Sequence, residues 1–234
     1  MKKQLLLTLL LFVAFTVSSQ IDRTNEKAYI PKGKWMTSGT ISIDTGNGKS
    51  NYNYEDPDYV NTSESENIRF SIAPKTGYSF AKNWIVGVGI GYIYDRNKSK
   101  YFENDSITEK SEYTSNSFSI NPFVRRYISV GKNLTFFFQG ETNFQYSKSK
   151  AKDFILTDPD NEDNFTSKSI FVGIRPGLNY FFNDHWALET TVGRAGYQHT
   201  NNDNDINNFG VYESNRFFID LNLTDVYFGV SYFF

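Results

Sequence analysis

The chain has no cysteine, only two histidines and a single long apolar run in 234 residues. Without cysteine it has no disulfide, no thiolate metal site and no catalytic thiol. The apolar run, Leu5–Val17, is too short to cross a hydrocarbon core of about 30 Å as a helix, so a bundle of membrane helices is excluded. Acidic residues outnumber basic ones 26 to 24, which argues against nucleic-acid binding. With only His185 and His199 available, we expect no metal centre and no cofactor.

The N-terminal residues have the order of a secretory signal peptide. Two lysines precede the apolar run and small residues follow it, after which the sequence becomes abruptly polar. This order of basic start, apolar segment and small residues is typical of an exported protein. We therefore predict a signal peptide over residues 1–19.

Aromatic residues are unusually abundant, at 18% of the chain, with 22 Phe and 16 Tyr. Beyond residue 33, large apolar residues alternate with small or polar ones, and this period of two predicts β-strands. Between Trp84 and Tyr92, for example, the large side chains share one face and three glycines share the other. The predicted strands are eight in number, at about 34–44, 67–80, 84–95, 114–128, 134–147, 169–182, 186–197 and 217–234.

A repeat organises these strands into hairpins. Asn83, Asn133 and Asn183 are 50 residues apart, and each lies in a short turn between two predicted strands. Polar segments join the hairpins and are predicted to be long loops, at about 45–66, 95–113, 148–168 and 198–215. The phase of the last strand changes part-way, which predicts a bulge near Thr224-Asp225.

Volume decides which face of the strands points outward. An eight-stranded barrel is only just wide enough inside for side chains to fill it, and roughly five large apolar residues on each strand do not fit there. The aromatic face must therefore point outward, where lipid accommodates it. The sequence thus predicts an all-β protein, an eight-stranded antiparallel up-and-down transmembrane barrel of the outer membrane with short periplasmic turns and long extracellular loops.

Tryptophans support this placement. Trp35, Trp84 and Trp186 each begin an odd-numbered strand, so in an up-and-down barrel all three lie at the rim of short turns. Tryptophan favours the interface between lipid headgroups and hydrocarbon. We expect these three residues and Phe234 to be membrane-interface aromatics.

Several segments resemble the small outer-membrane β-barrel domain of OmpA/OmpX type from Gram-negative bacteria. The segments that carry the resemblance are Gly77-Tyr78, Asn83-Trp84, Gly87–Tyr92, Pro122–Tyr127 and Gly229–Phe234. The resemblance implies a barrel over 34–234, preceded by a periplasmic tail over 20–33, without a peptidoglycan-binding domain. It also implies that the terminal aromatic, Phe234, is part of the signal read by the barrel-assembly machinery. Many members of that group have no assigned function, so the resemblance says little about activity.

Charged residues on the inward face are the candidate site. By strand phase, three cations and three anions point into the lumen: Lys75, Arg125, Glu141, Arg175, Glu189 and Asp225. Unpaired charges in a narrow interior are costly, whereas pairs across strands form a network that fills the lumen. The favoured hypothesis is therefore a closed, salt-bridged barrel with a structural or surface-interaction role. The alternative is a narrow pore for ions or small solutes, in which these pairs rearrange.

Other candidate sites have weaker support in the sequence. The segment Asp158–Asp163 places oxygen ligands at alternate positions, as a calcium loop does, but it lacks the glycine and distal glutamate of an EF-hand. A lipid-modifying enzyme at the outer rim would have only His199 as its base, and we expect no enzymatic activity. A soluble lipocalin-type barrel needs the opposite face inward. The expected partners are outer-membrane lipid, lipopolysaccharide and an external partner at the loops.

Overall fold

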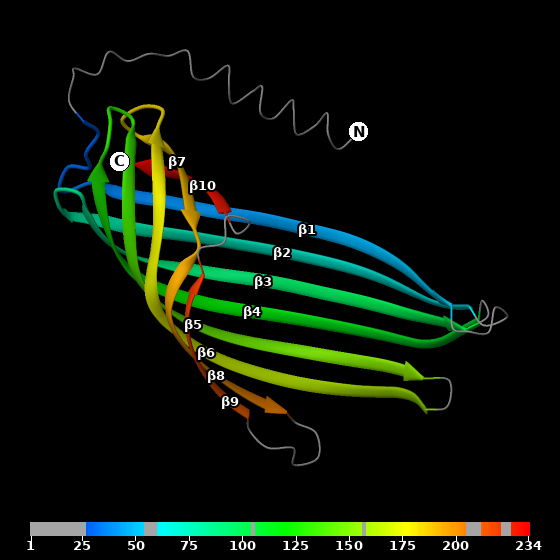
Figure 1. The fold of residues 1–234 in the computed structure, drawn as a ribbon. Helices are drawn as coiled ribbons and strands as arrows, with labels where there is room; N and C mark the ends of the chain where they lie inside the picture. The colour runs from blue at the N-terminus through cyan, green and yellow to red at the C-terminus, as the bar shows by residue number, and fades with distance from the viewer. Residues whose placement is uncertain (1–26, 54–59, 104–105, 156–157, 205–211, 221–225) are drawn as a thin grey trace.

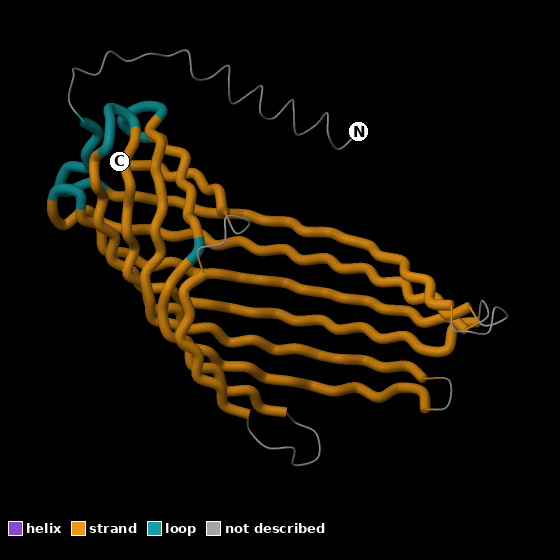
Figure 2. The backbone as a smooth tube through the Cα atoms, in the orientation of Figure 1, coloured by secondary structure: helices purple, strands orange, loops and turns teal. Residues whose placement is uncertain are grey.

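The computed structural model describes residues 27–53, 60–103, 106–155, 158–204, 212–220 and 226–234 (Figures 1 and 2). The predicted signal peptide therefore lies outside the described residues. Among the described residues, no helix is long and apolar enough to cross a membrane. The strands are β1 (Trp35–Asn53), β2 (Val60–Ala81), β3 (Trp84–Glu103), β4 (Ser106–Ser129), β5 (Leu134–Ile155), β6 (Asp158–Phe181), β7 (Trp186–Val192), β8 (Arg194–Asn204), β9 (Tyr212–Asp220) and β10 (Val226–Phe233).

Eight of these strands form a closed hydrogen-bonded ring. From β1 to β7 each strand pairs antiparallel with the next, and β10 pairs with both β7 and β1. The seam between β1 and β10 runs from the pair Met36–Phe233 to the pair Gly39–Val230. The ring confirms the predicted eight-stranded antiparallel barrel, and closure satisfies the backbone groups that lipid cannot.

Strand count differs from the prediction because the seventh and eighth predicted strands are each interrupted. Between the pairs Gly177–Thr191 and Ile174–Ala195, two residues of β6 face three of the next strand. Gly193 has a φ of 63° there, as in a β-bulge that requires glycine, and it separates β7 from β8. The register also shifts by four residues between the pairs Val192–Val226 and Arg194–Asp220. The bulge predicted near Thr224-Asp225 itself lies outside the described residues.

The segments predicted as long loops are largely β-strand, which corrects the prediction of long extracellular loops. Strands β1 to β6 have 19 to 24 residues, whereas about 9–11 suffice to cross a membrane. Figure 2 shows the strands running on from the barrel as a curved sheet. Cross-strand ion pairs such as Lys49–Glu64 and Arg96–Glu112 line this extension. Polar composition suggested loops, but paired opposite charges also stabilise antiparallel strands.

Both edges of the extended sheet, β1 and β9, lack a further neighbouring strand among the described residues. Beyond Gly39, β1 pairs only with β2, and β9 pairs only with β8. Figure 1 shows β8 and β9 following β6 on the far side of the sheet from β1. The ring is therefore closed at the end of the short turns and open between β1 and β9 farther out.

The side chains alternate between the two faces as the sequence predicts. Val86, Phe136 and Ile174 are 49%, 45% and 52% exposed on the outside, whereas Glu141 is buried inside. Short turns join the strands at 82–83, 130–133 and 182–185. Asn83 has a φ of 63° in the first of these turns, a backbone conformation that asparagine tolerates better than most residues.

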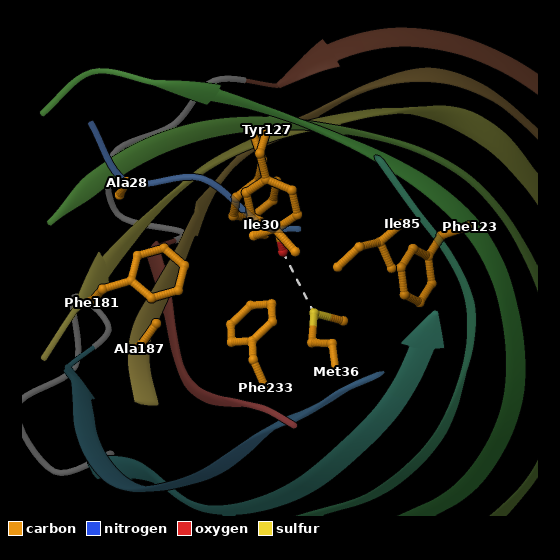
Figure 3. Packing of buried hydrophobic residues seen from close by; sticks show 10 residues of the cluster. Ala28, Ile30, Met36, Ile85, Phe123, Tyr127, Phe181, Ala187 and Phe233 are labelled. Carbon is orange, nitrogen blue, oxygen red and sulfur yellow. Dashed lines mark hydrogen bonds between the residues drawn. The ribbon is translucent and has the colours of Figure 1, made fainter. Parts of the chain in front are cut away.

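An apolar cluster fills the lumen at the end of the short turns (Figure 3). It contains Met36, Ile85, Phe123, Tyr127, Phe137, Phe181, Ala187 and Phe233, with Ala28 and Ile30 of the N-terminal segment. That segment is fixed by backbone bonds from Ala28 N–H to the Gly131 carbonyl and from Asn83 N–H to the Ile30 carbonyl. Inward rings lie over glycines, so a side chain added at Gly177 would overlap the ring of Phe137.

Candidate functional site: the charged network in the lumen

The centre of the site is a buried carboxylate held between two cations. Glu189 is on β7, Arg125 on β4 and Lys75 on β2, and all three point into the lumen. Arg125 Nη1 and Nη2 donate to the two carboxylate oxygens of Glu189 at 2.8 and 2.9 Å. Lys75 Nζ donates to Glu189 Oε1 at 2.9 Å. The Ser231 hydroxyl donates to Oε2 at 2.8 Å, so both carboxylate oxygens of Glu189 accept two hydrogen bonds.

Every nitrogen of the Arg125 guanidinium has a partner. Nε and Nη2 donate to Gln139 Oε1 at 3.0 and 2.6 Å, and Nη1 also donates to the Tyr127 hydroxyl at 2.9 Å. The guanidinium carbon lies 3.9 Å from the centre of the Phe137 ring, which is cation–π contact. The Arg125 side chain has no exposed surface. These contacts hold the Arg125 guanidinium on all sides within the lumen.

A second ion pair joins the first through Gln139. Arg175 on β6 donates to Glu141 on β5, with Nη2 at 2.9 Å from Oε1. The Gln139 side-chain amide donates to Glu141 Oε2 while its oxygen accepts from Arg125. Five of the six predicted lumen charges therefore meet in one connected cluster. Asp225, the sixth, lies outside the described residues.

A cavity of about 740 Å³ lies next to the network inside the barrel. Lys75, Glu141 and Arg175 line it together with polar residues such as Asn121 and Gln145. On the other side of the network is the apolar cluster described above. Along the barrel axis, the lumen thus contains the polar cavity, then the charged network, then the apolar cluster.

The structure also shows inward groups that the sequence reasoning missed. Gln139 and Tyr127 complete the network, and their inward phase was the only available signal. Farther out, Arg69 pairs with Asp95 at 3.5 Å across β2 and β3, in segments predicted as a strand end and a loop. Arg194 lies over the Phe171 ring at 4.9 Å, beside the strand break that the period-two pattern did not reveal.

The predicted interface aromatics point away from the lumen. Trp35, Trp84 and Trp186 each begin a strand at the short-turn end, and all are exposed. Trp84 also lies under Arg126, whose guanidinium carbon is 5.1 Å from its ring and whose Nη1 donates to the Lys82 carbonyl at 3.1 Å. Phe234 follows β10 at the same end and is exposed too.

The weaker candidates have other partners. His199 lies on the outward face of β8, where its Nδ1 is 2.9 Å from the Asn215 side-chain oxygen. Glu162, in the acidic segment that begins β6, pairs with Lys150 and Lys152. The hydrogen bond from Lys150, together with the hydrogen bond from Lys152 and the positive charge of both lysines, lowers the pKa of the Glu162 carboxyl. Within the described ranges, no group of three or more metal-ligating side chains is present.

The ring of eight antiparallel strands and its outward apolar band define a transmembrane β-barrel. Residues 25–195 match the family described as "Outer membrane protein beta-barrel domain", and the chain belongs to that family. It is thus an integral protein of the cell outer membrane. A solved structure, the crystal structure of the outer membrane protein OprG from Pseudomonas aeruginosa, is similar over 87% of this chain and 97% of that chain, with 12% identity and a TM-score of 0.40. No curated protein matches the chain significantly.

Proposed function

We propose that the protein is a closed barrel of the small OmpA/OmpX-like kind, with a structural or surface-interaction role. Its lumen does not conduct, and the polar sheet beyond the membrane is the part that meets the exterior. The lipid-facing wall anchors it, with Trp35, Trp84, Trp186 and Phe234 at the periplasmic interface. The aromatic end of β10 is the segment offered to the barrel-assembly machinery.

The observation that carries this proposal is the double closure of the lumen. Arg125 and Glu189 are buried and joined by two hydrogen bonds. Beneath them, Met36 and Phe233 belong to an apolar cluster that Ile30 of the N-terminal segment completes. An ion crossing this layer would have to break a buried charge pair and then pass an apolar region, both of which are costly.

The extended sheet supports a surface-interaction role. Its strands continue past the apolar band with charged residues on both faces, and β1 beyond Gly39 exposes one edge among the described strands. Unpaired strand edges can bind an extended segment of another protein by adding a strand. An external partner is therefore expected to bind the sheet and not the lumen.

Planar-bilayer recording of the purified protein tests the closed lumen. We expect no conductance above that of the protein-free bilayer over ±100 mV, a range chosen for the assay. A steady single-channel conductance in the unmodified protein would contradict the proposal.

A narrow pore is the second candidate, and the polar cavity favours it. The side chains of Lys75 and Arg175 keep 15% and 21% of their surface accessible there, so solvent reaches the outer side of the network. If the network were a gate, the unmodified protein would show conductance events and Arg125→Ala would lengthen them. If the lumen is closed at both the charged layer and the apolar cluster, neither the unmodified protein nor Arg125→Ala conducts above background.

A further inference from the structure

The outward wall of the barrel has a hollow bordered by lysines at one end. The hollow has a volume of about 870 Å³ and lies over β2 to β6 and β8. Its floor is apolar, with Ile90, Phe118, Ile120, Phe144 and Ile170 among its lining residues. All five project from the outer face, so the hollow opens to the lipid and not to the lumen.

The position of the lysines follows from the strand register. Phe118 on β4 pairs with Tyr146 on β5, which pairs with Lys168 on β6. One outward row farther along β5 is Lys148, diagonal to Lys168 across the two strands. Diagonal neighbours on one face are about 7–8 Å apart at Cα. The two ammonium groups can therefore reach a single anionic group.

These lysines lie where lipid headgroups are expected. Lys168 is 13 residues from Phe181, the end of β6 at the short turns, which corresponds to about 44 Å of strand. A tilt of about 35–45° reduces that length to about 31–36 Å along the membrane normal, which exceeds the roughly 25 Å of an outer-membrane apolar band. Lys168 therefore lies beyond the apolar band, on the side opposite the short turns.

Among the described residues, neither Lys148 nor Lys168 has a carboxylate within ion-pair distance, whereas the next two lysines along β5 do. Lys150 and Lys152 both pair with Glu162, whereas Lys148 instead lies 5.9 Å from the Tyr146 ring. Asp203 projects outward from β8 in the row of Lys148, with Thr166 of β6 between them. His199 and Asn201 add polar groups at the edge of the hollow.

We propose that this surface is a binding site for a phosphorylated, multiply acylated lipid of the outer leaflet. The acyl chains lie in the apolar hollow, and a phosphate of the headgroup accepts hydrogen bonds from Lys148 and Lys168. Apolar floor and cationic border together match the two halves of such a lipid, which a free phosphate would not. This inference rests on the outer-membrane location of the barrel and is independent of whether the lumen is closed.

Binding of diphosphoryl lipid A to the folded protein in detergent micelles, compared with its dephosphorylated form, tests the site. Native mass spectrometry gives the bound fraction of each. We expect the phosphorylated form to bind at least tenfold more tightly, and the double variant Lys148→Gln/Lys168→Gln to lose that preference. The matched control, Lys32→Gln/Lys34→Gln, removes two charges at the opposite rim and should bind as the unmodified protein does.

Three outcomes would overturn the proposal. The first is equal binding of the phosphorylated and dephosphorylated lipids, and the second is unchanged binding in the Lys148/Lys168 double variant. The third is displacement of the lipid by an equal concentration of inorganic phosphate, which would indicate a free-anion site. Heat-modifiable migration on a gel confirms that each variant is folded before its binding is compared.

Discussion

Replacing Glu189 with glutamine removes the one carboxylate that holds Arg125 and Lys75 together. The substitution preserves size and shape, so the change is almost purely one of charge. Arg125 has no exposed side-chain surface and Glu189 has 3%. The variant therefore leaves a buried guanidinium without its counter-ion.

The expected loss of stability can be worked from these contacts. A pair of unit charges 4 Å apart interacts by about 4 kcal/mol at an effective dielectric constant of 20, and Glu189 has two cations at hydrogen-bond distance. Part of this gain is offset by desolvation in the native state. Removing one partner of a buried pair typically costs about 3–5 kcal/mol, and we expect Glu189→Gln to fall in that range.

The assay is reversible urea unfolding of the protein folded into lipid vesicles, followed by tryptophan fluorescence. Glu64→Gln is the matched control, because Glu64 pairs with Lys49 at 3.0 Å while the side chains remain 40% and 61% exposed. Exposed pairs contribute about 0–1 kcal/mol. If both variants lose less than 1 kcal/mol, the reasoning that a buried network stabilises the lumen is wrong.

Three further predictions concern packing, titration and turn geometry. Gly177→Val should lower the free energy of unfolding by about 1–3 kcal/mol in urea unfolding, because the new side chain overlaps an inward aromatic ring. The control Gly131→Ala, whose new methyl group meets open space, should change it little. Equal effects of the two substitutions would contradict the packing. NMR titration should give the Glu112 carboxyl a pKa below its ordinary 4.5, because burial, which raises the pKa, is outweighed by the hydrogen bond and charge of Arg96. The stability that Glu112 contributes is present above pH 4.5 and is lost as the pH falls through the lowered pKa. Arg96→Gln should raise the pKa of Glu112. Asn83→Ala should cost about 1–2 kcal/mol more than Asn83→Gly because the backbone is left-handed there; the reverse order would refute the strain.

The barrel could be predicted from the sequence because one signal, the period of two, repeats on every membrane-crossing strand. Large residues such as Val86 and Phe136 alternate with small or polar ones, and volume then decides the face. The short turns were also predictable, since each carries an asparagine at a fixed interval. These features depend on local pattern and on the size of an eight-stranded barrel, both of which the sequence contains.

The extended sheet and the apolar base were not predictable in the same way. Beyond the apolar band both faces of the strands are polar, so alternation gives no signal, and pairs such as Lys49–Glu64 are apparent only once the register is known. Phe137 is an inward ring accommodated by Gly177 on the neighbouring strand, and Phe233 packs in the apolar cluster. The role of Gln139 likewise depends on which strands become neighbours. Such contacts join residues far apart in the sequence, and strand phase alone does not identify them.

Site-directed spin labelling in lipid vesicles tests the central claim most directly, namely that the aromatic face touches lipid and the polar face lines the lumen. The chain has no native cysteine, so Ile120→Cys and Asn121→Cys each give a single labelling position. Ile120 is exposed on the outer wall and Asn121 lines the lumen cavity. We predict that a label at 120 collides frequently with dissolved oxygen, which concentrates in the acyl chains, and that a label at 121 does not. A label at 121 that is oxygen-accessible, next to a shielded label at 120, would contradict the account.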